Sequence, residues 1–176
     1  MSNKVSKGAR PESSKNKRRR AGTRTKTNAT KLYAAIDLGT NNCRLLIVEA
    51  TRSSFRVRDS FSRIVRLGEG LDKDGILSEG AMSRTLSALS ICASKIRKAG
   101  VARVRCVATE ACRNAENGEK FVKRVREETG LCLEIIDGAA EAELATVGCG
   151  SLFENQVDHI IVFDIGGGST DIMRLD

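Results

Sequence analysis

The sequence is poor in aromatic residues and in histidine. Among its 176 residues it has five Phe, one Tyr, no Trp and a single His. The core must therefore be built from aliphatic side chains, which is typical of the buried strands of an α/β protein. With 40% hydrophobic residues the chain is long and apolar enough to form such a core.

Long apolar runs are also missing. No stretch approaches the roughly 20 apolar residues that a membrane-spanning helix needs. The basic N-terminal stretch is not followed by the apolar segment of a signal peptide. We therefore expect a cytoplasmic protein without a membrane-spanning segment.

The six cysteines lack the spacing of a metal site. No two of them form a CxxC pair, and the one histidine adds little to a ligand set, which argues against zinc. Most lie within apolar runs, where a free thiol behaves as a small hydrophobic side chain. We expect reduced thiols in the core of a cytoplasmic protein.

The net charge of +8 belongs almost entirely to the N-terminal segment. Residues 1–30 hold ten Lys or Arg and one acid, whereas residues 31–176 hold twenty Lys or Arg and twenty-one acids. The segment has no apolar periodicity, so we expect residues 1–30 to form a disordered basic tail. Two interpretations stay open: an arm that contacts a polyanion such as RNA, polyphosphate or a membrane surface, or a solvated terminus. Base stacking is not expected, because the tail has no aromatic residue.

Apolar patterning from residue 31 onward predicts an α/β lobe that opens with three strands. We expect these strands at residues 32–37, 43–50 and 54–67, the third with an irregularity, paired as an antiparallel meander. Residues 68–75 are expected to form a loop.

The remainder alternates helices and strands. Ser78 is a suitable N-cap for a long helix with one apolar stripe, which ends at Gly100. We then expect, in order, a strand at 104–109, a helix at 117–128, a strand at 131–137, a helix at 139–152 and a final hairpin.

Two segments about 130 residues apart repeat one pattern. "AAIDLGTNN" and "IVFDIGGGST" each place an aspartate, Asp37 or Asp164, at the end of an apolar strand before a glycine turn with hydroxyl side chains. Carboxylates suit a hard cation such as Mg²⁺, and glycines let backbone N–H groups approach a phosphate. One such turn is often only a hairpin. Two of them predict a phosphate site.

The chain resembles the exopolyphosphatase / guanosine pentaphosphate phosphatase family of the actin-like, sugar-kinase-like superfamily. The two segments above, with "LGEGLDKDGILSEGAMSRTLSAL", "VATEACRNAENGEKFVKRV" and "LEIIDGAAEAEL", follow the family's order over residues 33–176. The resemblance implies a ribonuclease-H-like, actin-like lobe with a five-stranded mixed sheet at residues 31–155. Residues 156–176 would then be the first hairpin of a second lobe, with the active site between the lobes.

The same resemblance implies Mg²⁺-assisted hydrolysis of a terminal phosphoanhydride in polyphosphate or guanosine pentaphosphate, and full-length relatives that are homodimers. Glu141 would activate the attacking water, and Asp37 and Asp164 would organise the metal. The phosphate-binding residues would be Thr40, Asn41, Asn42, Arg44, Arg113, Gly166, Gly167, Gly168 and Ser169.

Three of these assignments have alternatives. Arg44 begins a strand and either reaches phosphate or pairs with an acid. Arg113 is otherwise an ordinary arginine at a helix start. Glu141 is otherwise a first-turn glutamate favoured by the helix dipole, and Glu110 and Glu143 compete with it as general base.

The sequence departs from the family pattern at a few positions. Asn42 replaces a serine, Asp171 replaces a glutamate, and Glu143 stands where the family has arginine. A second acid next to Glu141 would raise the pKa of Glu141 or weaken polyanion binding.

The resemblance implies that the sequence includes only the first hairpin of the second lobe. Because phosphoryl transfer depends on positioning, we expect an incomplete fragment with reduced or no activity. The alternatives are a kinase or ATPase of the same superfamily, or a non-catalytic polyanion-binding module.

Overall fold

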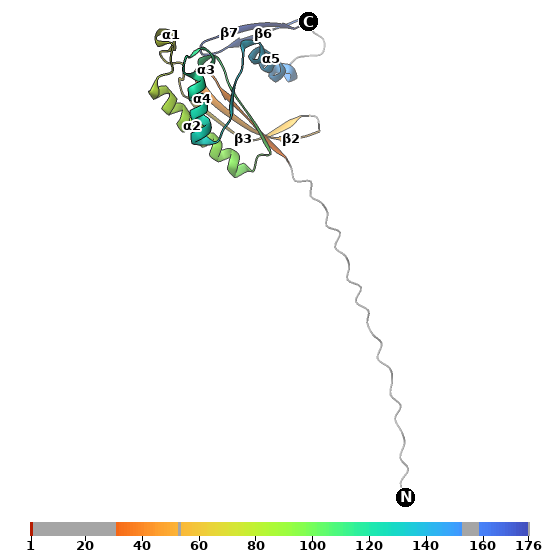
Figure 1. Ribbon diagram of the computed structural model, residues 1–176. Coiled ribbons are helices and arrows are strands. Elements are labelled where there is room, and N and C mark those ends of the chain that lie inside the picture. The colour runs from red at the N-terminus through yellow and green to blue at the C-terminus, as the bar shows by residue number, and fades with distance from the viewer. Residues whose placement is uncertain (2–30, 53, 153–158, 176) are drawn as a thin grey trace.

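The strands of the computed structural model form two sheets, and the structure describes Met1 and residues 31–52, 54–152 and 159–175 (Figure 1). The larger sheet has the order β3-β2-β1-β4-β5, and the smaller one is the hairpin β6-β7. The strands are β1 (Leu32–Leu38), β2 (Asn42–Ala50), β3 (Phe55–Ile64), β4 (Arg103–Ala108), β5 (Leu133–Ile135), β6 (Ile160–Ile165) and β7 (Thr170–Leu175).

The larger sheet is mixed, as expected for a ribonuclease-H-like lobe. β1, β2 and β3 pair antiparallel, whereas β4 pairs parallel with β1 and β5 pairs parallel with β4. The predicted meander is therefore confirmed. The predicted irregularity is present as well, because the β2–β3 register shifts between Ile47 and Val48.

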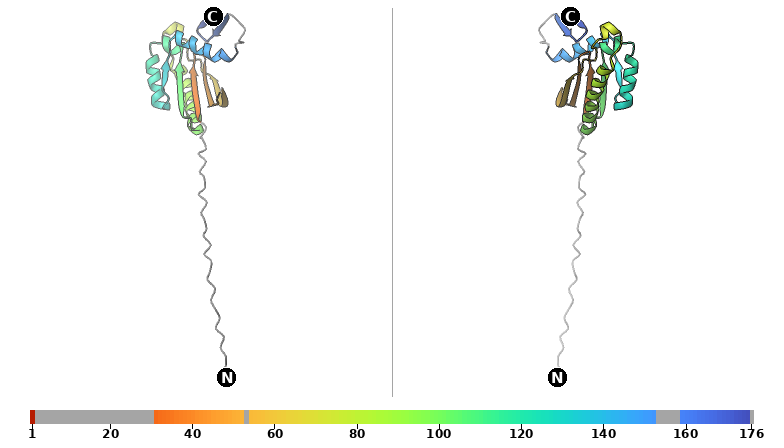
Figure 2. Two further views of the ribbon diagram at one scale, coloured as in Figure 1. Left: turned by 90° about the vertical axis from the view of Figure 1, so that its right-hand side faces the viewer. Right: turned by 90° about the vertical axis from the view of Figure 1, so that its left-hand side faces the viewer.

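Helices connect the strands, and α2 and α4 cover one face of the larger sheet (Figure 2). The helices are α1 (Leu71–Asp74), α2 (Glu79–Ala99), α3 (Glu110–Asn114), α4 (Gly118–Thr129), α5 (Gly138–Cys149) and the 3₁₀ turn η1 (Gly150–Leu152). α2 contacts β1, β2 and α4, and α4 contacts β5. The caps predicted for α2 are confirmed: the Ser78 hydroxyl accepts from the backbone N–H of Ala81, and Gly100 is left-handed with φ 64°.

Several predicted elements differ from the structure. The third strand ends at Ile64 and not at residue 67, and the strand expected at residues 131–137 spans only Leu133–Ile135. The loop expected at residues 68–75 contains the one-turn helix α1, which left-handed Gly70 and Gly75 bracket with φ 82° and 68°. The five-residue helix α3 was not predicted, because it is too short to show a periodicity. The last predicted helix ends at Cys149 and continues as a 3₁₀ turn.

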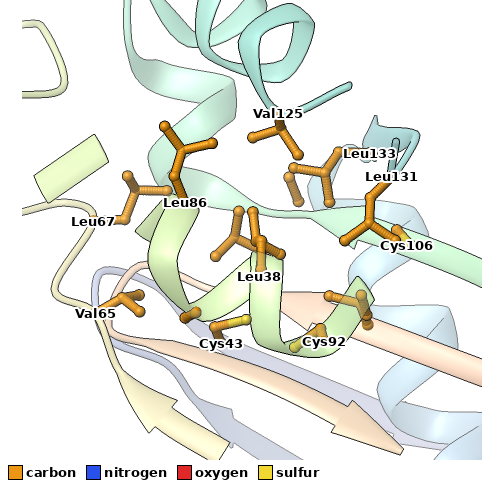
Figure 3. Close-up of a cluster of buried hydrophobic side chains, with 14 of the residues drawn as sticks. Leu38, Cys43, Val65, Leu67, Leu86, Cys92, Cys106, Val125, Leu131 and Leu133 are labelled. Carbon is orange, nitrogen blue, oxygen red and sulfur yellow. The ribbon is translucent and has the colours of Figure 1, made fainter. Parts of the chain in front are cut away.

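Strand alternation separates a core face from a site face. Ile36, Leu38, Cys43, Leu45 and Ile47 of β1 and β2 are at most 2% exposed and pack under the helices. Figure 3 shows this core, which is aliphatic as predicted. Because successive side chains in a strand point to opposite faces, Asp37 and Arg44 lie on the other face.

The prediction of reduced cysteines in the core is confirmed in part. All six, which lie within the described ranges, are free thiols. Four of them are buried, but Cys132 is exposed. In the described part of the chain, no helix is long and apolar enough to cross a bilayer.

The hairpin β6-β7 and α5 lie together at one end of the larger sheet (Figure 2). α5 contacts both strands, and the Thr146 hydroxyl donates to the Met173 sulfur at 3.2 Å. This arrangement brings the turn of the second hairpin to the turn between β1 and β2. The boundary predicted at residues 155 and 156, and the tail at residues 2–30, lie outside the described residues.

Candidate phosphate-binding site

The two repeated segments fold into turns of the same construction. In the β1–β2 turn the N–H of Gly39 donates to the carbonyl of Asn42 at 2.9 Å, and in the β6–β7 turn the N–H of Gly166 donates to the carbonyl of Ser169 at 2.8 Å. Each aspartate stands directly opposite a residue seven positions later, Asp37 opposite Arg44 and Asp164 opposite Asp171. The resemblance between the sequences is therefore also a resemblance in backbone structure.

The two turns are in direct contact. A Cβ on Gly167 would lie 2.5 Å from Nδ2 of Asn41 and 2.7 Å from its Cγ, so the backbone of Gly167 lies against the Asn41 amide. Only a residue without a Cβ allows this approach.

The loop after β3 fixes the β1–β2 turn from its other side. The carbonyl of Asn41 accepts from Val65 at 2.8 Å and from Arg66 at 3.0 Å, and the carbonyl of Thr40 accepts from Gly68 at 3.1 Å. The turn is thereby held in a fixed conformation before any ligand binds.

A cavity of about 340 Å³ lies between the turns and contains most of the predicted residues. The predicted residues that line this cavity, called the site cavity below, are Asp37, Thr40, Asn41, Asn42, Arg44, Glu141, Asp164, Gly166, Gly167 and Ser169. Arg113 and Gly168 are not among the lining residues.

Burial and neighbouring charges together shift the pKa of Asp37. Burial raises the pKa of Asp37, the Arg44 guanidinium lowers it, and the nearby Asp164 carboxylate raises it; the net direction is upward. Arg44 Nη1 lies 3.9 Å from Asp37 Oδ2, a long and exposed ion pair. The structure is therefore compatible with both alternatives for Arg44, since this residue pairs with Asp37 and also lines the cavity.

Glu141 stands in the first turn of α5, whose N-cap Asp137 accepts from the N–H of Ala140 at 2.8 Å. Arg113 Nη1 donates to Glu141 Oε2 at 3.2 Å and to the carbonyl of Ile136 at 2.8 Å. The Glu141 side chain is only 19% exposed and that of Arg113 28%. Arg113 thus positions Glu141, a contact that the sequence did not indicate.

The pKa of Glu141 is raised. Burial is the largest cause, the hydrogen bond and charge of Arg113 lower the pKa, and the carboxylates of Asp171 and Asp37 raise it. A carboxylate with a raised pKa is a better proton acceptor near neutral pH.

Thr109 is a site residue that the sequence analysis missed. It follows β4, lines the site cavity, and donates its N–H to the carbonyl of Leu38 at 3.1 Å. Its position after a strand parallel to β1 places it at the same sheet edge as Asp37. The signal available was a hydroxyl residue at the end of the strand predicted at residues 104–109.

The donor set suits Mg²⁺. Asp37 and Asp164 lie close enough for one carboxylate to affect the pKa of the other. Within the described residues, no group of three or more His, Cys, Asp or Glu side chains is placed to hold a metal ion. Mg²⁺ needs only one or two carboxylates, because waters and substrate phosphates complete its octahedron.

Two hairpins that present glycine turns and carboxylates to one cavity define a candidate phosphate site in an α/β protein. The chain belongs to the Ppx/GppA phosphatase family, whose sequence profile matches residues 46–176. It is 39% identical over 150 residues to a bifunctional 3-dehydroquinate synthase/phosphatase of Fusobacterium nucleatum subsp. nucleatum, which covers 80% of this chain and 22% of that protein.

Solved structures agree with this assignment. A Ppx/GppA family member of Aquifex aeolicus is 30% identical with a TM-score of 0.71, and the match covers 82% of this chain and 51% of the other. An exopolyphosphatase of Cytophaga hutchinsonii is 29% identical with a TM-score of 0.76, over 82% of this chain and 46% of the other. The chain thus spans about half the length of these solved relatives, and the predicted fold class is confirmed.

Proposed function

We propose that this chain carries the N-terminal part of the active site of a phosphohydrolase that releases terminal phosphate from inorganic polyphosphate or guanosine pentaphosphate. One observation carries the proposal: Glu141, Asp37 and Asp164 line the same cavity as both phosphate-binding turns. Membership in the Ppx/GppA phosphatase family supports the same reaction class.

In the proposed reaction a water oxygen forms a bond to the terminal phosphorus. The bond from that phosphorus to the bridging oxygen breaks, and the shortened chain leaves with the bridging oxygen. Glu141 accepts the proton of the attacking water, and its raised pKa suits that role. Arg113 keeps the Glu141 carboxylate in place through its hydrogen bond.

The turns bind the phosphate itself. Both turns line the site cavity, and Thr40 and Ser169 are among the lining residues. Fixed N–H and hydroxyl donors at this place would stabilise charge on phosphoryl oxygens. Arg44 adds a positive charge at the cavity wall. Asp37 and Asp164 would hold Mg²⁺, which neutralises negative charge on the phosphate oxygens when it is bound.

The test compares three forms of the 176-residue chain: wild type, Glu141→Gln, and Glu143→Gln as the competing assignment on the same helix. Phosphate release from polyphosphate is measured with and without Mg²⁺. We expect slow, Mg²⁺-dependent release that falls by about 100-fold or more in Glu141→Gln and changes by less than about twofold in Glu143→Gln. The three chains share one basic tail, so tail binding cannot produce the difference. Release that survives in Glu141→Gln refutes the assignment of the base.

If the wild-type chain releases no phosphate, binding decides. Inorganic phosphate should then still shift the amide signals of Thr40 and Gly167 in a nuclear magnetic resonance titration. Unshifted signals at both residues would contradict the proposed site.

A further inference from the structure

A second polar cavity adjoins the site cavity. It has a volume of about 440 Å³, and Thr40, Asn41 and Gly167 line both cavities. We call it the outer cavity; Arg66, Asp72 and Glu110 are among its other lining residues. The two turns form the partition between the two cavities. A substrate chain that binds at the turns can therefore extend from them into the outer cavity.

Glu110 lies at this partition and contacts both turns. The Thr40 hydroxyl donates to Glu110 Oε2 at 3.4 Å. A Cβ on Gly168 would overlap the same carboxylate oxygen, so the backbone of the second turn packs directly on it. Glu110 is also the first residue of α3, the helix that provides Arg113. Its carboxylate therefore faces the place where the two phosphate-binding turns meet.

The charges of the outer cavity do not suit a phosphate chain. Among the described residues, Arg66 is the one cation that lines it, against Glu69, Asp72 and Glu110. Glu69 is neutralised by Arg84, whose Nη2 lies 2.5 Å from Glu69 Oε2. Asp72 and Glu110 still outnumber Arg66, and like charges in a partly enclosed space raise the cost of an anion there.

We propose that Glu110 is a specificity-determining residue whose carboxylate keeps a phosphate chain out of the outer cavity. The inference rests on the proposed function, since it assumes that a terminal phosphate binds between the two turns. A phosphate chain must then leave through the mouth of the site cavity. The outer cavity stays open to groups without negative charge.

The experiment measures binding and not turnover. The 176-residue chain is prepared ¹⁵N-labelled with Glu141→Gln to stop hydrolysis, alone and combined with Glu110→Gln, Glu110→Asp or Glu119→Gln. Inorganic phosphate and tripolyphosphate are titrated at constant Mg²⁺, and the amide signals of Thr40 and Gly167 report binding at the turns. These signals separate the site from any binding to the basic tail.

Glu110→Gln should tighten tripolyphosphate binding about tenfold and inorganic phosphate binding about twofold, because only the longer anion extends past the turns. Glu110→Asp keeps the charge and should keep the wild-type ratio of the two affinities. Glu119→Gln removes an equal charge from an exposed position that lines neither cavity, and should change neither affinity by more than about twofold.

An unchanged affinity ratio in Glu110→Gln overturns the inference and leaves the proposed function standing. A ratio that changes equally in Glu110→Asp shows a packing role at Thr40 and Gly168, and also overturns it. If neither anion shifts the two amides in any of the proteins, the phosphate site itself fails and the inference falls with it.

Discussion

Replacing Arg113 with methionine removes the guanidinium and keeps an unbranched side chain of similar length. Nη1 of Arg113 joins two parts of the site, because it donates both to Glu141 Oε2 and to the carbonyl of Ile136 just before α5. The substitution therefore removes the two hydrogen bonds that join α3 to the start of α5, where Glu141 is held.

The expected magnitude follows from these two hydrogen bonds. A bond to a charged partner contributes about 1.5–3 kcal/mol and a neutral one about 1 kcal/mol. Both side chains retain some contact with solvent, with 28% and 19% exposure, so the lower values apply. We expect Arg113→Met to lower the free energy of unfolding by about 2 kcal/mol, and the melting temperature by about 4–8 °C.

The same substitution changes the ionisation of Glu141. Arg113 lowers the pKa of Glu141 against the effects of burial and of Asp171. Without Arg113 that pKa rises further, so Glu141 takes up its proton at a higher pH than in the wild type. A carboxyl ¹³C titration of Glu141 measures the shift, and a urea unfolding series measures the stability. Arg113→Lys, which keeps the charge, should restore most of the titration curve. An unchanged Glu141 titration in Arg113→Met would refute the assignment of Arg113 as the residue that positions the base.

Three further predictions test the turns, the carboxylates and the tail. Gly167→Ala places a Cβ against the Asn41 amide and should weaken inorganic phosphate binding about tenfold by calorimetry, whereas Gly148→Ala, with open space around its Cβ, should leave binding unchanged. Asp37→Asn should raise the melting temperature at pH 7 by about 1–2 °C, because the folded state raises the pKa of Asp37 and so disfavours its charged form. This gain should shrink as the pH falls below 3.8, the ordinary pKa of the group, because the carboxyl then becomes protonated in both states. A gain that grows on acidification would contradict the sign. Deleting residues 1–30 should flatten the salt dependence of polyphosphate binding and leave the response of the Gly167 amide to inorganic phosphate unchanged; equal salt slopes would show that the tail makes no polyanion contact.

Local chemistry made most of the fold predictable. Ser78 and Gly100 bound α2 because a hydroxyl cap and a left-handed glycine are short-range signals that tertiary contacts did not override. The apolar alternation of β1 and β2 likewise placed their core faces. α1 and α3 were missed because such short helices depend on contacts with neighbouring loops. One such contact joins the end of α1 to the segment after α3, where the Glu116 N–H donates to the carbonyl of Gly75 at 3.0 Å.

The site was predictable in its parts and not in its contacts. The repeated Asp-Gly pattern identified Asp37 and Asp164, and the structure places both at one cavity. No local pattern indicated that Arg113 would pair with Glu141, since 28 residues separate them and the Arg113 side chain reaches the first turn of α5 only in the folded chain. The contact of Glu110 with Thr40, across 70 residues, was hidden for the same reason.

The proposed function requires a terminal phosphate to bind between the two turns with Glu141 beside it. A crystal structure of the Glu141→Gln chain with Mg²⁺ and tripolyphosphate tests this requirement. We expect a terminal phosphate that accepts hydrogen bonds from both turns, with Mg²⁺ at Asp37 and Asp164 and the side chain of residue 141 facing the phosphorus. A phosphate chain bound elsewhere on the described lobe, with the site cavity holding only water, would contradict it.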